Sequence, residues 1–500
     1  MSFAPLAAAG VFTESLTDLI PRLLQSSILW TVIIVLAEVC ALVSMVHVVI
    51  RARTAAGAWG WAMGLFSFPF LAVPLYWVFG RKNFHGYRES LREAREKRED
   101  LVEEIIEALE PHFSCLVGDW ARYGGILEKL SERRFTRDNS VDLLIDGEAT
   151  FNAIFSAIDE AENYILVQFF IIRDDALGQE LKRRLIEKSR AGVRVYVLYD
   201  EIGSHRLRSG YARELRREGV NISEFQTTRG KSNRFQVNFR NHRKVFVVDG
   251  KVAFVGGHNV GIEYLGLNEK VGHWRDTHVR VRGPAVLTTQ LVFLGDWYWA
   301  TRELPDLDWR PRYIAPEDGV SVLPLATGPV ENLEGGTLFF LHSINRARKR
   351  LWIASPYFVP DESVRSALQL AALRGVDVRI MLPERPDHKT VYLASFAYLG
   401  EMEAAGVRMF RYGAGFLHQK VMLVDDQLAS VGTANLDNRS LRLNFELSMV
   451  VLGQEFCAEV EKMLETDFAK CREIDGSDYT EKSVWFRAGV RLARLAAPLL

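Results

Sequence analysis

The feature that most constrains this chain is a segment that occurs twice. His242–Asn259 reads HRKVFVVDGKVAFVGGHN, and His418–Asn435 reads HQKVMLVDDQLASVGTAN, so the two copies align without a gap. In each copy an apolar run follows H-x-K, an acidic residue marks a turn, and a second apolar run ends at a glycine, which predicts strand, turn and strand. A unit repeated at so long an interval predicts two duplicated halves rather than a solenoid.

Strand and helix patterns alternate around the repeat. Between the short apolar runs Tyr164–Ile172 and Val193–Tyr199 lies a helical pattern, Leu177–Arg190, and similar runs return at Leu351–Val359 and Gly375–Leu382. This order is typical of βαβ units. We therefore predict an α/β fold in which two halves, each with a mixed sheet covered by helices, form one active site at their interface.

Two apolar runs, residues 28–50 and 55–79, precede the α/β part. Each is long enough to cross a bilayer core as a helix, so they predict a transmembrane helical hairpin and a multi-pass integral membrane protein. A cleaved signal peptide and a pair of buried core helices are the alternatives. The basic residues after the second run place the C-terminal part in the cytoplasm, although Arg51 and Arg53 in the turn oppose this weakly.

The remaining boundaries follow from charge patterns. Alternating Arg and Glu at 83–110 predict a solvated helical connector. Near the C-terminus, arginines at helical spacing predict either an interfacial helix on anionic lipid or a helix docked on the globular part. In chain order, the predicted parts are an N-terminal segment (1–27), the hairpin (28–80), a charged connector (81–139), the first half (140–310), the second half (311–482) and a basic amphipathic tail (483–500).

The charge balance and the cysteines exclude several functions. The 500 residues include 62 Lys and Arg against 63 Asp and Glu, and this balance argues against a protein that coats nucleic acid. The 4 cysteines show neither a disulfide framework nor metal-ligand spacing. We therefore expect no nucleic-acid partner, no metal and no cofactor.

The duplicated segment carries the candidate chemistry. Residues two apart in a strand point to the same face, so the histidine and lysine of each H-x-K project together. Imidazoles act as nucleophile, base or acid, while lysines, asparagines and backbone N–H groups bind anionic oxygens. Two such sets around one cleft suit a phosphodiester without a metal. The residues are His242, Lys244, Asn259, His418, Lys420 and Asn435, with Gly257 and Thr433 beside the asparagines.

Other residues allow more than one interpretation. Asp249 and Asp425 complete the two motifs and are predicted members of the catalytic group, but aspartate also stabilises turns by bonding to the backbone. The aromatic segment Phe293–Trp299 either faces lipid or forms a buried helix face. Four further histidines have no assigned partner: His205, His258, His273 and His278.

The twinned H-x-K-x-x-x-x-D motif resembles the hallmark of the phospholipase D superfamily, over about residues 140–475. The hairpin, Asp200–Ser204, Trp274–His278 and the C-terminal Pro498–Leu500 are more closely similar to bacterial cardiolipin synthases. This resemblance implies a location in the bacterial inner (plasma) membrane. One departure is Gly257, where the family commonly has serine; the hydroxyl contact to phosphate is then in doubt, while the backbone donor remains.

The resemblance also implies a transfer through a phosphohistidine. One histidine attacks the phosphorus of phosphatidylglycerol, glycerol leaves, and the hydroxyl of a second phosphatidylglycerol resolves the intermediate to give cardiolipin. His242 is assigned as nucleophile and His418 as general acid and then base, although the duplication also allows the reverse. Because such a histidine needs an orienting carboxylate, we expect Glu446 to hydrogen-bond His418 and Asp276 to hydrogen-bond His242; surface salt bridges are the alternative.

Other functions would use the same residues. A phospholipase D that transfers to water, or another phosphatidyltransferase such as a phosphatidylserine synthase, has an identical predicted site. The neutral charge and the hairpin disfavour a nuclease, and two complete motifs disfavour an inactive lipid-binding scaffold. The expected partners are phosphatidylglycerol and membrane lipid, and the sequence leaves the oligomeric state open.

Overall fold

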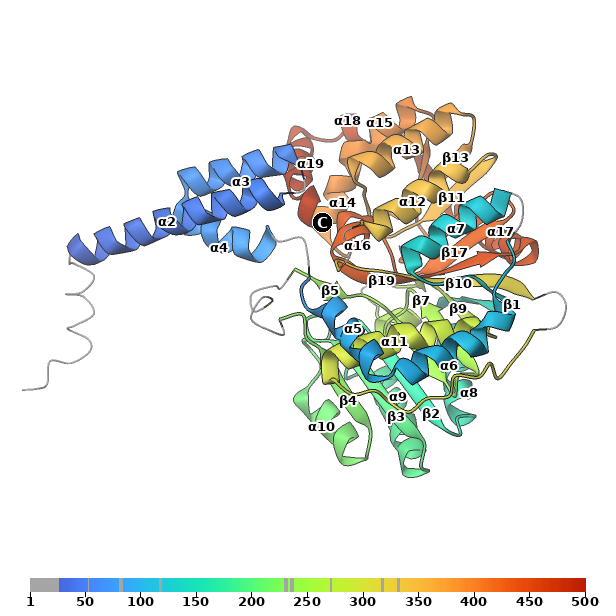
Figure 1. Cartoon of the computed structure of the whole chain (residues 1–500). Helices are drawn as coiled ribbons and strands as arrows, with labels where there is room; N and C mark the ends of the chain where they lie inside the picture. Colours follow the sequence, from blue (N-terminus) through green and yellow to red (C-terminus); the bar gives the residue numbers. More distant parts are fainter. Residues whose placement is uncertain are drawn as a thin grey trace, which may run out of the picture. The chain divides into compact units, whose positions relative to one another are not determined.

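The computed structural model describes residues 27–52, 54–80, 84–116, 119–228, 233, 238–269, 272–315, 319–330 and 333–500. The chain divides into two compact units, Met1–Lys82 and Asn83–Leu500 (Figure 1). The predicted N-terminal segment, apart from Ser27, lies outside the described residues.

Three apolar helices form the described part of the first unit. They are α2 (Ser27–Arg51), α3 (Ala55–Ser67) and α4 (Pro69–Phe79), and each packs against the other two. Among the described residues, only α2 is long and apolar enough to cross a membrane. The prediction of a single helix over 55–79 is wrong, because Phe68 leaves the helical region (φ −139°, ψ 61°). Its successor, Pro69, disfavours helical geometry in the residue before it and lacks an amide donor.

A continuous sheet of 16 strands organises the second unit (Figure 1). Fifteen of them form one row whose order repeats symmetrically about two central neighbours, and the short β5 (Arg240–Asn241) pairs beside this row. These neighbours, β1 and β10, pair antiparallel. From the centre outwards the first half contributes β1 (Thr136–Ile145), β9 (Thr277–Arg282), β7 (Val252–Gly256), β6 (Val245–Val248), β2 (Tyr164–Phe169), β3 (Arg194–Asp200) and β4 (Asn221–Phe225). The second half contributes β10 (Val320–Thr327), β19 (Asn444–Leu452), β17 (Leu428–Gly432), β16 (Val421–Val424), β11 (Arg350–Ala354), β13 (Asp377–Pro383), β14 (Arg408–Tyr412) and β20 (Cys471–Ile474).

The predicted α/β fold with two duplicated halves is therefore confirmed. The strand β6, the turn and β7 are the first copy of the repeat, while β16 and β17 are the second. Both copies place their apolar residues in the buried sheet, which explains why the repeated segments keep the same length.

Helices cover both faces of the sheet around three hydrophobic cores. The halves share one core, which includes residues of α11 (Ala285–Thr301) and α17 (Gln454–Phe468). Phe293 and Trp297 are buried there, so the aromatic segment is a buried helix face. The first half has its own core beneath α8 (Asp146–Asp159), α9 (Ala176–Arg190) and α10 (Ser209–Arg217). The second has another beneath α12 (Gly335–Arg346), α13 (Glu362–Leu373) and α14 (Lys389–Ser395).

The predicted solvated connector is instead part of the folded unit. Helices α5 (Tyr87–Lys97) and α6 (Glu99–Leu109) bury one face in the shared core, and α5 lies beside α11 (Figure 1). Helix α7 (Asp119–Ser131) contributes Tyr123 and Leu127 to the core of the second half. The prediction is wrong because a few apolar residues at helical spacing are enough to dock a highly charged helix.

Candidate active site

His242 lies where the first half crosses onto the second. Strand β5 (Arg240–Asn241), directly before it, pairs in parallel with Asn444–Phe445 of β19, and the His242 amide donates to the carbonyl of Phe445 at 2.9 Å. This register places Glu446 beside the imidazole, whose Nδ1 lies 2.9 Å from Glu446 Oε2 and 3.1 Å from the carbonyl of Thr433. A proton on Nδ1 faces both acceptors, which leaves the lone pair on Nε2.

His418 lies at the symmetry-related crossing. Strand β15 (Phe416–Leu417), directly before it, pairs in parallel with β8 (Trp274–Arg275), and the His418 amide donates to the carbonyl of Arg275 at 2.8 Å. Asp276 follows β8, and its Oδ2 lies 2.7 Å from His418 Nδ1. Lys420 Nζ lies 2.8 Å from the same ring nitrogen. Each half therefore supplies one histidine and the carboxylate that contacts the other half's histidine.

The expected pairing, Glu446 with His418 and Asp276 with His242, is wrong. The physical reason is the parallel pairing of β5 with β19 and of β15 with β8, which joins the two halves beside each histidine. Surface salt bridges are also excluded, because both carboxylates are buried.

The two carboxylates have different surroundings. Glu446 accepts hydrogen bonds from the hydroxyls of Thr433 at 2.5 Å and Ser440 at 2.7 Å, and from Asn444 Nδ2 at 3.1 Å. Asp276 accepts from the amide of Thr277 at 2.8 Å and contacts Trp274 Nε1 at 3.4 Å. Burial raises the pKa of each carboxyl, but the neighbouring lysines and histidines lower it by a larger amount. The pKa of both carboxyls is therefore below the usual value.

The lysines and histidines of the site affect one another's charge. Lys244 Nζ donates to the carbonyl of His242 at 2.7 Å, and Lys420 donates to the carbonyl of His418. Burial lowers the pKa of both histidines to about 4, the pKa of Lys244 to about 7 and that of Lys420 to about 8. Both imidazoles are therefore neutral at pH 7. A bound phosphodiester would raise all four pKa values, because its negative charge favours the protonated forms.

The asparagines and small residues of the repeat lie beside this group, with unequal contacts. Asn259 accepts from the amide of Ile171 at 3.1 Å and donates to Tyr264 Oη at 3.2 Å, so local structure already holds its side chain. Asn435 is also buried, and its Oδ1 has no hydrogen-bond partner among the described residues. A β-carbon on Gly257 would overlap the Asp276 carboxylate, so this position has no room for the serine common in the resembling family.

Asp249 and Asp425 lie away from the histidines, at the turns that end β6 and β16. Asp249 accepts from the amides of three consecutive residues, Glu162–Tyr164, at 2.8 to 2.9 Å. Asp425 accepts in the same way from Arg348–Arg350 at 2.8 to 3.2 Å. Both also have positive φ, 51° and 52°. The geometry contradicts the catalytic interpretation and supports the turn-stabilising one, since a four-residue strand of about 13 Å separates each aspartate from its lysine.

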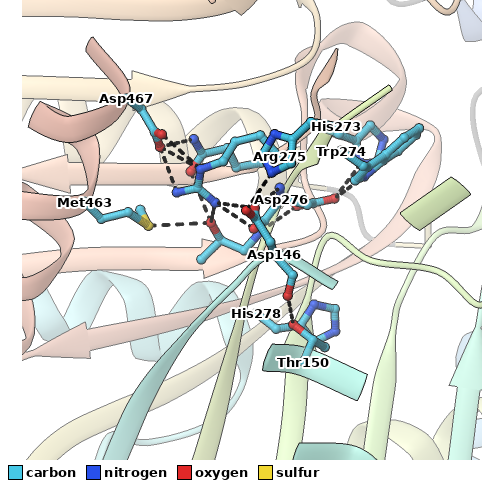
Figure 2. A network of polar contacts seen from close by, with 12 residues as sticks. Asp146, Thr150, His273, Trp274, Arg275, Asp276, His278, Met463 and Asp467 are labelled. Carbon is cyan, nitrogen blue, oxygen red and sulfur yellow. Dashed lines mark hydrogen bonds and ion pairs between the residues drawn. The ribbon is translucent and has the colours of Figure 1, made fainter. Parts of the chain in front are cut away.

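Two buried ion pairs, which the sequence analysis missed, hold the histidine segments. Arg243, between His242 and Lys244, lies 2.7 Å from Asp296 of α11 and donates to the carbonyl of Glu446 at 3.1 Å. Arg275 lies 2.7 Å from Asp467 of α17 and also reaches Asp146, as Figure 2 shows. An arginine within or directly beside a catalytic motif is the sequence signal that indicates such a pair.

The four unassigned histidines have partners in the structure. His258 and His278 are both buried, with their Nδ1 atoms 3.1 Å apart. His273 Nε2 lies 3.0 Å from Asp146, and His205 Nδ1 lies 2.9 Å from the carbonyl of Ile202. Within the described part of the chain, no group of three or more histidines, cysteines and carboxylates has a geometry that would hold a metal ion.

The duplicated sheet and the two histidines on crossed carboxylates define a phospholipase D-like protein. A family model described as "Cardiolipin synthase, PLD-like domain" matches residues 154–277 and 340–468, which include both copies of the repeat. A solved structure of phosphatidylserine synthase from Haemophilus influenzae covers 76% of this chain and 100% of its own with a TM-score of 0.56, and at 18% identity this likeness concerns the fold alone.

Curated relatives match almost the whole chain. Cardiolipin synthase A of Pseudomonas entomophila is 48% identical over 93% of this chain and 97% of its own. Cardiolipin synthase A of Pseudomonas aeruginosa is 47% identical over 99% of this chain and 100% of its own. The chain belongs to the cardiolipin synthase family of the phospholipase D superfamily, a family of phosphatidyltransferases. This confirms the predicted resemblance.

Proposed function

We propose that this protein transfers a phosphatidyl group from one phosphatidylglycerol to a hydroxyl of a second, which gives cardiolipin and glycerol. The observation that carries the proposal is the pair of neutral histidines, each with Nδ1 on a buried carboxylate of the opposite half and a lysine of the same motif close by. Relatives named cardiolipin synthase A over nearly the full length support the choice of reaction.

In the first step, His242 Nε2 attacks phosphorus and forms a P–N bond while the P–O bond to glycerol breaks. His418, protonated once the anionic substrate raises its pKa, gives its proton to the departing oxygen. The two acceptors on His242 Nδ1, Glu446 and the Thr433 carbonyl, support its role as the nucleophile, because they keep the proton away from Nε2. Asp276 and Glu446 orient the rings and stabilise the charge that develops on them.

In the second step, neutral His418 takes the proton from a hydroxyl of the second phosphatidylglycerol. That oxygen attacks phosphorus, the P–N bond breaks, and His242 returns to its starting form. Lys244, Lys420, Asn259 and Asn435 hold the phosphate oxygens through both steps. The amides of Gly257 and Thr433, which the sequence placed in this group, instead donate to the carbonyls of Thr277 and Leu447 at 3.0 Å.

The apolar first unit supports an integral membrane location. Helix α2 has the length and composition of a membrane span, and α3 and α4 pack against it as a second, broken arm. We place the second unit on the cytoplasmic side of the bacterial inner membrane, because α5 carries several basic residues shortly after the apolar unit. Protease digestion of inside-out and right-side-out vesicles tests this orientation; cleavage of the second unit only in right-side-out vesicles contradicts it.

The decisive experiment follows products from labelled phosphatidylglycerol in mixed micelles with purified full-length protein. Cardiolipin and glycerol in equal amounts support the proposal. Phosphatidic acid without cardiolipin would replace it with hydrolysis, since water and a lipid hydroxyl compete for the same phosphoenzyme. A nucleotide requirement would also contradict it, because the transfer conserves the phosphodiester bond and needs no activated donor.

A further inference from the structure

The C-terminal helix α19 (Val484–Leu495) docks on the second half through one face only. Val490 and Ala493 are buried in the core of that half, and the half-buried Phe486 packs edge-on against Phe396 with ring centroids 5.2 Å apart. These contacts include helix α14. The helix is therefore a fixed part of the globular unit.

The opposite face of α19 presents large apolar side chains to solvent. Trp485 is 86% exposed, Leu495 79%, Leu492 69% and Val484 68%. Their spacing places the four residues on one side of the helix, away from the docked residues. A tryptophan this exposed, among three exposed aliphatic side chains on one short helix, indicates a surface that another phase or molecule covers.

A basic stripe borders this apolar face. Arg487, Arg491 and Arg494 recur at intervals of four and three residues, and no acidic residue occurs from Val484 to the C-terminus. Arg494 lies 3.9 Å from Glu401, whereas neither of the other two arginines has an ion pair with a described residue. An apolar face bordered by arginines matches the layers of a bilayer surface, where rings and aliphatic groups lie below anionic headgroups.

The end of the chain fixes this helix beside the site. The carbonyl of Leu500 accepts from the amide of Arg439 at 3.0 Å, and that of Ala497 accepts from Asn438 Nδ2 at 2.9 Å. Both donors belong to α16 (Asn438–Arg442), whose Ser440 donates to the carboxylate that contacts His242. The exposed face therefore has a defined position relative to the reacting groups.

We propose that the exposed face of α19 lies in the headgroup layer of a membrane that contains anionic phospholipid. This surface is separate from the residues that carry the transfer, so the proposal stands independently of the proposed reaction. The occupant is a lipid surface rather than a protein, because three arginines without an acidic neighbour on the helix complement a negative surface potential, and tryptophan favours this layer.

A spin label at position 492 tests this in full-length protein reconstituted in phosphatidylcholine vesicles with or without phosphatidylglycerol. The label is attached to L492C in a chain whose accessible cysteines, Cys40, Cys115 and Cys471, are replaced. Cys457 is kept, because it is buried and does not react with the label. We expect several-fold greater relaxation by bilayer-dissolved oxygen than by a water-soluble nickel complex when phosphatidylglycerol is present. The double variant R487E/R491E and the single variant W485S should each reverse this preference.

A matched label at Leu373, which is 71% exposed on α13, should stay accessible to the nickel complex in all vesicles. Equal accessibility of positions 492 and 373 to nickel would overturn the proposal. Shielding of position 492 from both reagents would also overturn it, because that result indicates coverage by another part of this chain or a second copy. Neither outcome bears on the reaction, which the product assay tests separately.

Discussion

The two halves of the second unit place the same groups around the reacting atoms but support them differently. In both, the histidine Nδ1 contacts a carboxylate from the other half. The carboxylate that contacts His242 is a glutamate, which accepts a hydrogen bond from the hydroxyl of Thr433. The carboxylate that contacts His418 is the shorter aspartate, which lies beside Gly257. The length of the acidic side chain and the size of the residue beside it thus compensate each other. This indicates that both halves preserve the position of the carboxylate oxygen.

The layer behind the site differs more. The first half has the buried pair His258 and His278, while the aligned positions of the second half hold Ala434 and Ser448. There, Ala434 and Ser448 line a small cavity with room for about one water molecule, which also reaches Lys420. The reacting groups are therefore alike in the two halves, while the residues that pack behind them differ. Substitutions in each half should consequently distinguish the roles of the two histidines.

Removal of either imidazole should have the largest effect. H242A and H418A should each lower turnover by more than about 10,000-fold, because each step needs both groups. Only H418A should still release an activated leaving group, such as p-nitrophenol from its phosphatidyl ester, in a single turnover, since this group departs without a proton. A burst from H242A instead would assign the roles in reverse, and full activity of either variant would end the two-histidine mechanism.

Loss of charge on the carboxylates should have the next largest effect and tests the crossed pairing. E446Q and D276N should each lower turnover by about 100- to 1000-fold, because the amide disturbs both the tautomer and the charge of the ring. With the activated ester, D276N should give a burst, as expected for H418A, because Asp276 contacts His418. E446Q should give no burst, as expected for H242A. The opposite pattern would contradict the geometry, and E187Q, at an exposed carboxylate of α9, is the matched control.

The sequence carried the reacting groups but not their pairing. The spacing of His242–Lys244 and His418–Lys420 predicted both the shared face and the two α/β halves, because strand periodicity is a local property. The partners of these histidines depend on parallel pairing between distant segments, and the paired residues are 204 and 142 positions apart, a distance that no local pattern covers.

Two other errors had local signals. Pro69 within an apolar run indicated the break at Phe68, and the apolar spacing in 99–109 indicated that the connector docks. The role of Asp249 needed the structure, since the amides that it binds belong to a loop far away in sequence.

A side chain at Gly257 should distinguish the halves with an intermediate effect. G257S should lower activity by about 10- to 100-fold, because its β-carbon displaces Asp276 and moves the His418 ring from its working position. T433S keeps the hydroxyl on Glu446 and should remain within about twofold of the parent. Activity assays of the two variants check this, and equal activity would show that Asp276 tolerates the shift.

The pH dependence should reveal the two lysines. In the free protein kcat/KM should fall below about pH 4 as His242 gains a proton. Above that pH it should fall about tenfold per pH unit, because His418 must take up a proton before it acts as the acid, and it should fall more steeply above about pH 7 to 8 as Lys244 and Lys420 lose their protons. K420M should have low activity and a weaker alkaline fall, whereas K251M, at an exposed lysine, should keep the parent profile. An alkaline limb unchanged in K420M would assign it to another group.

The smallest effect on catalysis should come from the layer behind the site. H258A removes the ring that lies 3.1 Å from His278 Nδ1, while the amide of residue 258 still donates to that nitrogen at 3.3 Å, and the lost contact and the cavity should reduce the free energy of unfolding by about 1–3 kcal/mol. The double variant H258A/H278S, which copies the second half at both positions, should be destabilised by less than the sum of the single changes, because the contact between the two rings is then lost only once. Thermal unfolding in detergent measures this coupling, and turnover should change little because neither ring contacts His418. Additive losses of stability, or a loss of activity as large as that of D276N, would show that the histidine pair positions Asp276 and that the two halves differ in mechanism as well as in support.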